Sequence, residues 1–153
     1  QMRALETLAH ELGMAVLIPE TYVADLNVRL ALYRRLGEIQ IDQDIDAFAA
    51  EMIDRFGPLP DEVKHLLRIV SIKRLCKMAG VAKIDAGPKG ATIAFRNNVF
   101  ANPGKLLAYI GMQANTMKVR QDQTILYTRN WPDEESRIAG ASQLVAKLAE
   151  LAA

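Results

Sequence analysis

The chain has 153 residues, half of them hydrophobic, and its 19 lysines and arginines nearly balance its 18 aspartates and glutamates. This length suits one domain, or one compact unit of a larger protein, and it is sufficient to bury a core. The formal net charge of +1 excludes a whole-chain field that would draw the protein to nucleic acid or to an anionic membrane, so either contact requires a local patch.

Cysteine content and hydropathy narrow the class of protein further. Cys76 is the only cysteine, which excludes an internal disulfide framework and a multi-cysteine metal site, and its place in an apolar helical run predicts a buried, reduced thiol. No apolar stretch approaches the roughly 20 residues that cross a bilayer, and no signal peptide opens the sequence. We therefore expect a soluble, cytoplasmic protein, and the opening Gln1 indicates either a piece cut from a larger one or the remnant of a tag.

The first residues predict an arm that leads into a domain. Residues 3–12 have the pattern of a short helix, and Met14–Ile18 has the pattern of a brief strand that Pro19 stops. We expect residues 1–13 to be an entry arm or linker, and residues 14–153 to be a single domain.

The first main helix is predicted from Asp25 to about Gly37. Apolar side chains recur on one of its faces, which we expect to face the core, and three arginines lie outside that face. The apolar positions are Leu26, Leu30, Tyr33 and Leu36, widened by Val28 and Leu32, and the arginines are Arg29, Arg34 and Arg35.

A second helix is predicted up to Phe56, with Asp42 or Asp44 as its N-cap. Gly57 tolerates the left-handed conformation that ends a helix, and Pro58 blocks its continuation. The apolar stripe that we expect to face the core comprises Ile45, Phe48, Ala49, Met52, Ile53 and Phe56.

A third helix, from Pro60 to about Ala79, is apolar around more than half of its circumference, so we expect it to lie in the core.

After Gly80 the pattern changes to short alternating runs that are typical of strands. Two hairpins are predicted, with turns at residues 87–90 and 121–123, and between them lies a helix capped by Asn102. A final helix opens at Pro132 and carries a continuous apolar stripe. The sequence therefore predicts an α+β fold in which about three helices precede a β-β-α-β-β-α unit with a small antiparallel sheet.

The sequence offers few of the groups that catalysis requires. His10 and His65 are its only histidines, and it lacks the GxSxG, HExxH, paired CxxC and GxGxxG motifs. The lysine between glycines at residues 87–90 leads into a strand, whereas a phosphate-binding loop leads into a helix, so this segment is interpreted as a turn. We expect no catalytic residue, no metal site and no cofactor.

Two sets of charged side chains are candidate interaction sites. Glu51 and Asp54 place two acids in the last turns of their helix, where the macrodipole disfavours them, and a partner would explain their presence beside Arg55. The alternative is an i,i+4 ion pair between Glu51 and Arg55 with a solvated Asp54. Candidates for contact with nucleic acid or an acidic partner are Arg29, Arg34, Arg35, Arg68 and Arg74. A solvated basic face is the alternative for this second set.

The chain resembles the C-terminal domain of bacterial transcription-repair coupling factors, the Mfd family. Three strings carry the resemblance: IPETYVADLNVRLALYRRL at residues 18–36, EMIDRFGPLP at residues 51–60 and LLRIVSIKRLCKMAG at residues 66–80. The resemblance implies the terminal module of a large ATP-driven DNA translocase that removes stalled RNA polymerase and recruits nucleotide excision repair. The motor itself is not in this chain, because the sequence has no nucleotide-binding motif.

The resemblance also implies a role for the acidic helix. In that family the C-terminal domain is a regulatory clamp that docks on the protein's own N-terminal module and hides a UvrA-recognition surface, and its docking face maps onto Glu51, Asp54 and Arg55. We therefore expect a non-enzymatic, autoinhibitory module whose parent contacts RNA polymerase, DNA and UvrA, with no membrane partner. A nucleic-acid-binding accessory domain that uses the basic helix faces is the alternative function.

Overall fold

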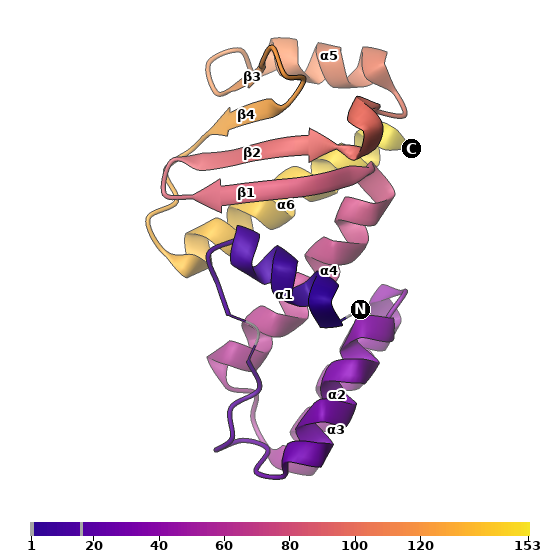
Figure 1. Ribbon diagram of the computed structural model, residues 1–153, viewed down its shortest axis with the longest axis vertical. Helices are drawn as coiled ribbons and strands as arrows, with labels where there is room; N and C mark the ends of the chain where they lie inside the picture. Colours follow the sequence, from indigo (N-terminus) through magenta and orange to yellow (C-terminus); the bar gives the residue numbers. More distant parts are fainter. Residues whose placement is uncertain (1, 16) are drawn as a thin grey trace. The chain divides into compact units, whose positions relative to one another are not determined.

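The computed structural model describes residues 2–15 and 17–153 (Figure 1). These residues form helices and a four-stranded sheet, in the order α1 (Met2–Glu11), α2 (Leu26–Glu38), α3 (Asp42–Phe56), α4 (Asp61–Ala79), β1 (Val81–Gly87), β2 (Gly90–Phe95), η1 (Arg96–Asn98), α5 (Pro103–Met112), β3 (Met117–Val119), β4 (Ile125–Thr128) and α6 (Glu134–Ala152). The predicted α+β fold, with helices before a β-β-α-β-β-α unit, is confirmed.

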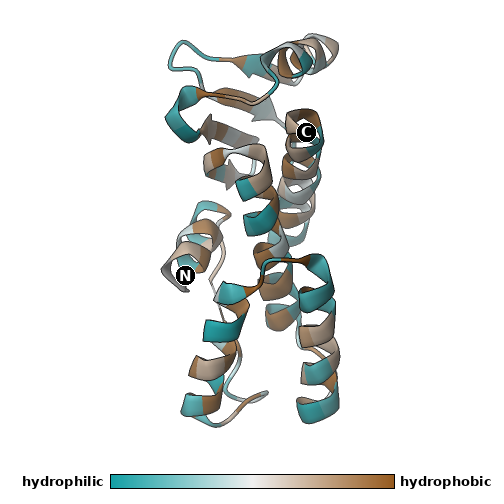
Figure 2. Ribbon diagram, turned by 90° about the vertical axis from the view of Figure 1, so that its right-hand side faces the viewer, coloured by the Kyte–Doolittle hydropathy of each residue, from teal (hydrophilic) through white to brown (hydrophobic). Residues whose placement is uncertain are grey.

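The chain divides into two compact units. Unit 1 comprises Gln1–His10 and Ala15–Arg74, and unit 2 comprises Glu11–Met14 and Leu75–Ala153. Helix α4 therefore contributes residues to both units. Helices of the two units carry hydrophilic and hydrophobic residues on different sides, as Figure 2 shows. That residues 14–153 form a single domain stays a prediction.

Unit 1 buries the apolar sides of its helices. Its most deeply buried large side chains are Leu5, Ile18, Leu32, Leu36, Met52, Leu66, Ile69 and Ile72. Helix α2 begins at Asp25, whose side chain accepts a hydrogen bond from the amide of Val28. Helix α3 begins after Ile41, which makes no side-chain cap bond, so the predicted caps Asp42 and Asp44 are wrong. Both lie in the first turn, where their charges stabilise the positive end of the helix.

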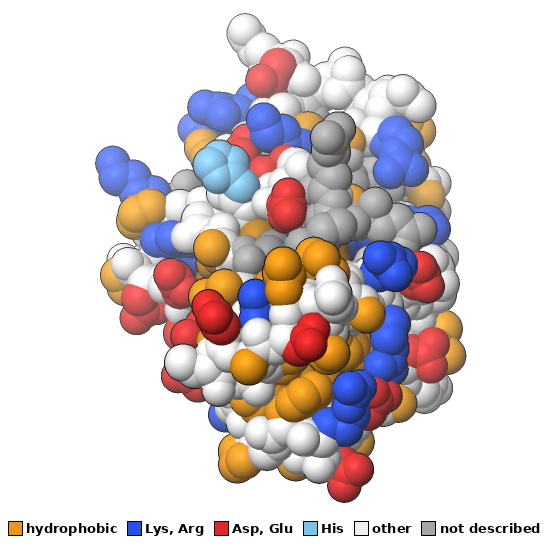
Figure 3. All heavy atoms as spheres, turned by 60° about the horizontal axis from the view of Figure 1, so that its bottom comes forward, with side chains coloured by type: hydrophobic (Ala, Val, Ile, Leu, Met, Phe, Trp, Pro, Cys, Tyr) orange, Lys and Arg blue, Asp and Glu red, His pale blue; other side chains and the backbone are white. Residues whose placement is uncertain are grey.

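Three apolar side chains that were expected to face the core lie largely in solvent. Leu26 and Leu30 of α2 are 57% and 49% exposed, and Ile53 of α3 is 50% exposed. The apolar face of each helix is wider than the surface that its neighbours cover, and hydrophobic spacing alone does not reveal this. Apolar side chains therefore lie among charged ones on the surface, as they do on the face drawn in Figure 3.

The predicted strand at Met14–Ile18 is also wrong. Its described residues have no strand conformation, and residue 16 lies outside the described ranges. Ile18 is buried, and its backbone amide donates a hydrogen bond of 2.6 Å to the hydroxyl of Tyr33 on α2. A side chain thus supplies the partner that a neighbouring strand would otherwise provide.

Unit 2 is built on an antiparallel sheet with strand order β1-β2-β4-β3. Both predicted hairpins are present, with turns at Pro88-Lys89 and at residues 120–124. Helix α6 lies along the sheet and contacts β1 and α5 (Figure 1). Its first turn is fixed by a capping box in which the Ser136 amide donates to the Asp133 carboxylate at 2.8 Å.

The predicted roles of two side chains of unit 2, Asn102 and Cys76, can be compared with the structure. Asn102 occupies the N-cap position of α5, as predicted, but its amide makes no cap bond there and donates to the carbonyl oxygens of Ala152 and Ala153. Cys76 is buried and free, as predicted, and burial, with a smaller contribution from the charge of Glu11, raises the pKa of its thiol to about 12. This thiol stays protonated and unreactive.

Candidate interaction surface on helices α2 and α3

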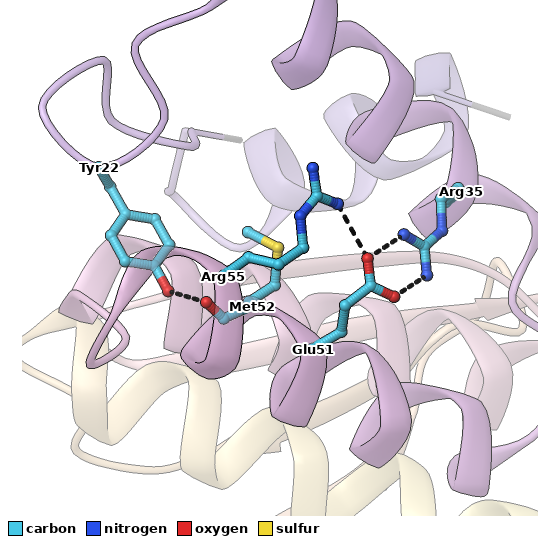
Figure 4. Close-up of polar contacts among 5 residues, drawn as sticks. All are labelled: Tyr22, Arg35, Glu51, Met52 and Arg55. Carbon is cyan, nitrogen blue, oxygen red and sulfur yellow. Dashed lines mark hydrogen bonds and ion pairs between the residues drawn. The ribbon is translucent and has the colours of Figure 1, made fainter.

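Glu51 is the centre of an ion-pair cluster that joins α2 to α3 (Figure 4). Arg35 of α2 binds the Glu51 carboxylate in a bidentate manner, with Nη1 to Oε2 and Nη2 to Oε1 both at 2.8 Å. Arg55, one turn along α3, donates to Oε2 at 2.9 Å. Both carboxylate oxygens therefore already accept from guanidinium groups of the same chain.

Aromatic side chains lie beneath both arginines. The guanidinium of Arg35 lies 5.1 Å from the centre of the Phe48 ring, and that of Arg55 lies 4.8 Å from the centre of the Phe56 ring. These contacts restrict the arginines to the positions that Glu51 requires. The Glu51 side chain is still 36% exposed, so the cluster belongs to the protein surface.

The two arginines change the acidity of Glu51. Hydrogen bonds from Arg35 and then from Arg55 lower the pKa of the Glu51 carboxyl to about 2, from an ordinary value of 4.5. The hydrogen bond to Glu51 in turn raises the pKa of Arg35. Glu51 and Arg35 are therefore both charged throughout the physiological pH range.

The structure brings together only part of the predicted docking trio. The i,i+4 pair between Glu51 and Arg55 is present, but Arg35 completes it from another helix. Asp54 is exposed, and within the described ranges its side chain has no hydrogen bond or ion pair. Arg35 was predicted only as a basic contact, because its distance of 16 residues from Glu51 gives no local signal of their pairing.

The C-terminal end of α3 is held by Tyr22, which the sequence did not single out. Its hydroxyl lies 2.7 Å from the carbonyl oxygen of Gly57 and 3.1 Å from that of Met52, and its ring contacts Phe56 at 5.7 Å between centroids. Gly57 has a φ of +94°, which a residue with a side chain rarely adopts. Tyr22 therefore fixes the end of α3 close to the ion-pair cluster (Figure 4).

An open hollow of about 280 Å³ lies between the C-terminal half of α2 and the first ten residues of α3, Asp42 to Glu51. Arg35 and Glu51 form part of its wall, so it adjoins the ion-pair cluster. The complete lining is Arg35, Glu38, Ile39, Asp44, Ala47, Phe48 and Glu51.

Most of the predicted basic contacts serve the fold. Arg29 donates to the carbonyl oxygens of Val23 and Ala24, which fixes the turn before α2. Arg74 donates to the carbonyl oxygen of Gln40 at 2.8 Å and to the carboxylate of Asp42 at 2.6 Å. These guanidinium groups are directed toward the protein instead of toward solvent.

The other basic candidates differ in exposure. Arg34 lies exposed on α2, Arg68 is half-buried on α4, and Arg35 is bound to Glu51 as described. The five arginines therefore do not form one uniformly solvated face. Their contact with nucleic acid or an acidic partner stays a prediction.

Neither a metal site nor a membrane span is found in the described ranges. Residues 2–15 and 17–153 contain no group of three or more histidine, cysteine, aspartate or glutamate side chains that could hold a metal ion. No helix formed by these residues is long and apolar enough to cross a membrane.

Comparison with known proteins places this architecture in one family. Residues 12–106 match the TRCF domain family. The chain is 38% identical over 140 residues to the transcription-repair-coupling factor of Rickettsia conorii, and 28% identical over 140 residues to that of Escherichia coli. Each match covers 92% of this chain and 12% of the relative. The chain thus spans about an eighth of the length of these curated relatives.

A solved structure shares the fold. The crystal structure of the C-terminal domain of a transcription-repair coupling factor superposes with a TM-score of 0.71 at 21% identity. The match covers 88% of this chain and 87% of that domain. The architecture described above is therefore that of a known domain.

Proposed function

This chain belongs to the TRCF domain family of transcription-repair coupling factors, and from that premise we propose that it is an autoinhibitory module. In this proposal it masks the UvrA-recognition surface on the N-terminal module of its parent, an ATP-dependent DNA translocase that contacts RNA polymerase and DNA. The chain corresponds to the C-terminal domain of such factors and not to their motor. In the proposal, its own contribution is binding.

The observation that carries the proposal is the exposed charged surface that Arg35, Glu51, Asp54 and Arg55 form on α2 and α3. Its centre is prearranged, because the bidentate pair and the aromatic contacts hold the charged groups in place. A polar interface within one polypeptide suits a switch. The tether supplies a high effective concentration, so modest contacts hold the closed state and a competing partner opens it.

The nucleic-acid-binding alternative has less support. Binding to phosphate requires cations that face solvent, whereas Arg29 and Arg74 donate to groups of this chain. The net charge of +1 supplies no compensating long-range field. We therefore place nucleic-acid binding second.

The test is charge reversal in the full-length parent protein. We expect Asp54→Arg, alone and with Arg55→Glu, to raise the affinity for UvrA at least about fivefold, the change that ~1 kcal/mol produces. Asp46→Arg is the matched control, because it reverses one exposed acid on α3 outside the cluster. Equal UvrA affinity in the wild type and the Asp54 variants would contradict the proposed masking surface.

A second measurement isolates the intramolecular contact. This chain is titrated with the separately produced N-terminal module, and the dissociation constant is compared between the wild type, Asp54→Arg and Asp46→Arg. We expect only Asp54→Arg to weaken the complex. An unchanged constant for Asp54→Arg would remove this surface from the interface.

A further inference from the structure

The hydroxyl of Tyr22 binds the end of α3. It lies 2.7 Å from the carbonyl oxygen of Gly57 and 3.1 Å from that of Met52, and Figure 4 shows the second contact. Gly57 follows the helix, so its carbonyl oxygen has no partner within α3 and receives one from Tyr22. Burial raises the pKa of Tyr22 above its ordinary value of 10, so the hydroxyl keeps its proton and stays a donor at physiological pH.

The backbone that carries Tyr22 is fixed independently of α3. The amides of Tyr22 and Val23 donate to the carbonyl oxygen of Pro19, each at 3.0 Å. Val23 is buried, and Arg29 of α2 donates to its carbonyl oxygen at 2.7 Å. Tyr22 therefore reaches α3 from a turn that α2 holds in place, and it is a fixed attachment point for the end of α3.

Phe56 connects this attachment point to Arg55. The rings of Tyr22 and Phe56 pack at 5.7 Å between centroids with an interplanar angle of 57°. The guanidinium of Arg55 lies 4.8 Å from the centre of the Phe56 ring. Neighbouring residues of a helix do not face each other, so the Arg55 side chain reaches that ring only by bending toward the next residue. The position of the Phe56 ring therefore decides where the guanidinium can lie.

Glu51 holds Arg55 from another side. Nη1 of Arg55 donates to Oε2 of Glu51 at 2.9 Å, and the bidentate bonds from Arg35 fix Glu51 in turn. Arg55 thus lies between a ring that packs against Tyr22 and a carboxylate that Arg35 holds. Its side chain is nonetheless 43% exposed, so a guanidinium of defined orientation is accessible at the surface.

From these contacts we propose that Tyr22 is a positioning residue that sets, through Phe56, the orientation of Arg55 on the exposed surface. The hydroxyl fixes the end of α3, the Phe56 ring transmits that position, and the guanidinium takes the orientation that the ring and Glu51 allow. The inference deepens the proposed function and rests on it in one respect, that an oriented Arg55 takes part in masking. The orientation itself depends only on residues of this chain.

The experiment follows the arginine Nε–Hε groups of this whole chain by NMR. Tyr22→Phe keeps the aromatic ring and removes only the hydroxyl. We expect the Arg55 cross-peak to move toward the position of a free arginine, because the ring beneath the guanidinium loses its support. Phe56→Leu, which removes that ring and keeps the Tyr22 hydroxyl, should move the Arg55 cross-peak in the same direction.

Tyr33→Phe is the matched control. The Tyr33 hydroxyl also bonds to the main chain within unit 1, since it accepts from the amide of Ile18 at 2.6 Å. Both tyrosine variants should lower the urea midpoint of unfolding by comparable amounts, because each removes one hydroxyl bonded to the backbone. Only Tyr22→Phe should move the Arg55 cross-peak. This difference separates a positioning role from a general loss of stability.

An unmoved Arg55 cross-peak in Tyr22→Phe, or an equal movement in Tyr33→Phe, would overturn the positioning role of Tyr22. An unmoved cross-peak in Phe56→Leu would overturn the part assigned to the Phe56 ring.

The full-length parent protein separates this inference from the proposed function. There, Tyr22→Phe should raise the affinity for UvrA about two- to fivefold, the change that corresponds to the ~0.5–1 kcal/mol of one exposed cation–π contact. If the Arg55 cross-peak moves and Asp54→Arg raises this affinity but Tyr22→Phe does not, the link between Arg55 orientation and masking is wrong. If Asp54→Arg also has no effect, the proposed masking fails and the positioning of Arg55 by Tyr22 stands.

Discussion

At the scale of single residues, Glu51 links the stability of the fold to pH. Its folded pKa of about 2 lies below its ordinary value of 4.5, so the stabilisation is complete above pH ~4.5 and is lost as the pH falls toward 2. Because the side chain is 36% exposed, we expect Glu51→Gln to cost only about 0.5–1 kcal/mol at pH 7.

Urea unfolding of the wild type and Glu51→Gln at pH 7, 5, 3 and 2 measures this difference. The gap between the two proteins should be constant from pH 7 to 5 and should shrink from pH 4.5 to 2. Asp46→Asn, an exposed acid on the same helix, is the control. A gap that persists unchanged at pH 2 would show that ionisation of Glu51 is not its cause.

Gly90 is a second residue whose identity the backbone requires. Its φ of +119° disfavours any side chain, and a Cβ atom there would collide with the carbonyl oxygen of Tyr127 on β4. We expect Gly90→Ala to lower the free energy of unfolding by more than about 2 kcal/mol. Gly87→Ala, in the same hairpin, meets no atom and should change it by less than about 0.5 kcal/mol. Equal effects in thermal or urea unfolding would refute this explanation.

At the scale of elements, the sequence predicted the turns and helix ends that depend on residues close together in the chain. The turns at residues 87–90 and 121–123, the break at Gly57-Pro58 and the start of α6 just after Pro132 all follow from local backbone preferences and were found as predicted. The sequence could not reveal contacts between distant elements. Arg35 and Glu51 meet only when α2 lies beside α3, and Tyr22 reaches Gly57 across 35 residues.

Local patterns also did not determine how much of each apolar helix face is buried. Periodicity shows which face of a helix is apolar, but the width that becomes covered depends on the size of the neighbouring elements. Leu26 and Leu30 were therefore expected in the core and are found exposed. The described residues of the brief apolar run at 14–18 likewise adopt no strand conformation, although their pattern predicted one.

The contact of α6 with Trp131 gives a prediction for this helix. Trp131 is buried against Gly140, where an added Cβ atom would collide with its indole ring. Gly140→Ala should therefore destabilise the protein by more than about 1 kcal/mol, although alanine in a helix is ordinarily the better residue. A red-shifted tryptophan emission should accompany the loss, since Trp131 is the only tryptophan.

Helix α5 supplies the control for that prediction. Gly111 has open space where its Cβ would lie, so Gly111→Ala should stabilise the protein by about 0.5–1 kcal/mol or leave it unchanged. If both glycine variants stabilise the protein, the indole does not constrain Gly140.

At the scale of the whole molecule, the near balance of charge predicts weak binding to DNA. The net charge is +1, and Arg29 and Arg74 are engaged with the protein itself. We expect the isolated chain to bind duplex DNA with a dissociation constant above about 10⁻⁴ M at physiological salt, the weak end of the non-specific range. Fluorescence anisotropy of a labelled duplex measures this constant, and submicromolar binding with a steep salt dependence would revive the nucleic-acid alternative.

The side chain of Asn102 shows how a join between two helices can depend on the residue at one end and not at the other. Its amide and the ammonium of Lys105 both donate to the main-chain oxygen of Ala153. Every amino acid offers that oxygen, whereas only some side chains can supply either of the two donors. These two bonds therefore leave the side chain at position 153 unconstrained, whereas positions 102 and 105 must each supply a donor to join the start of α5 to the end of α6.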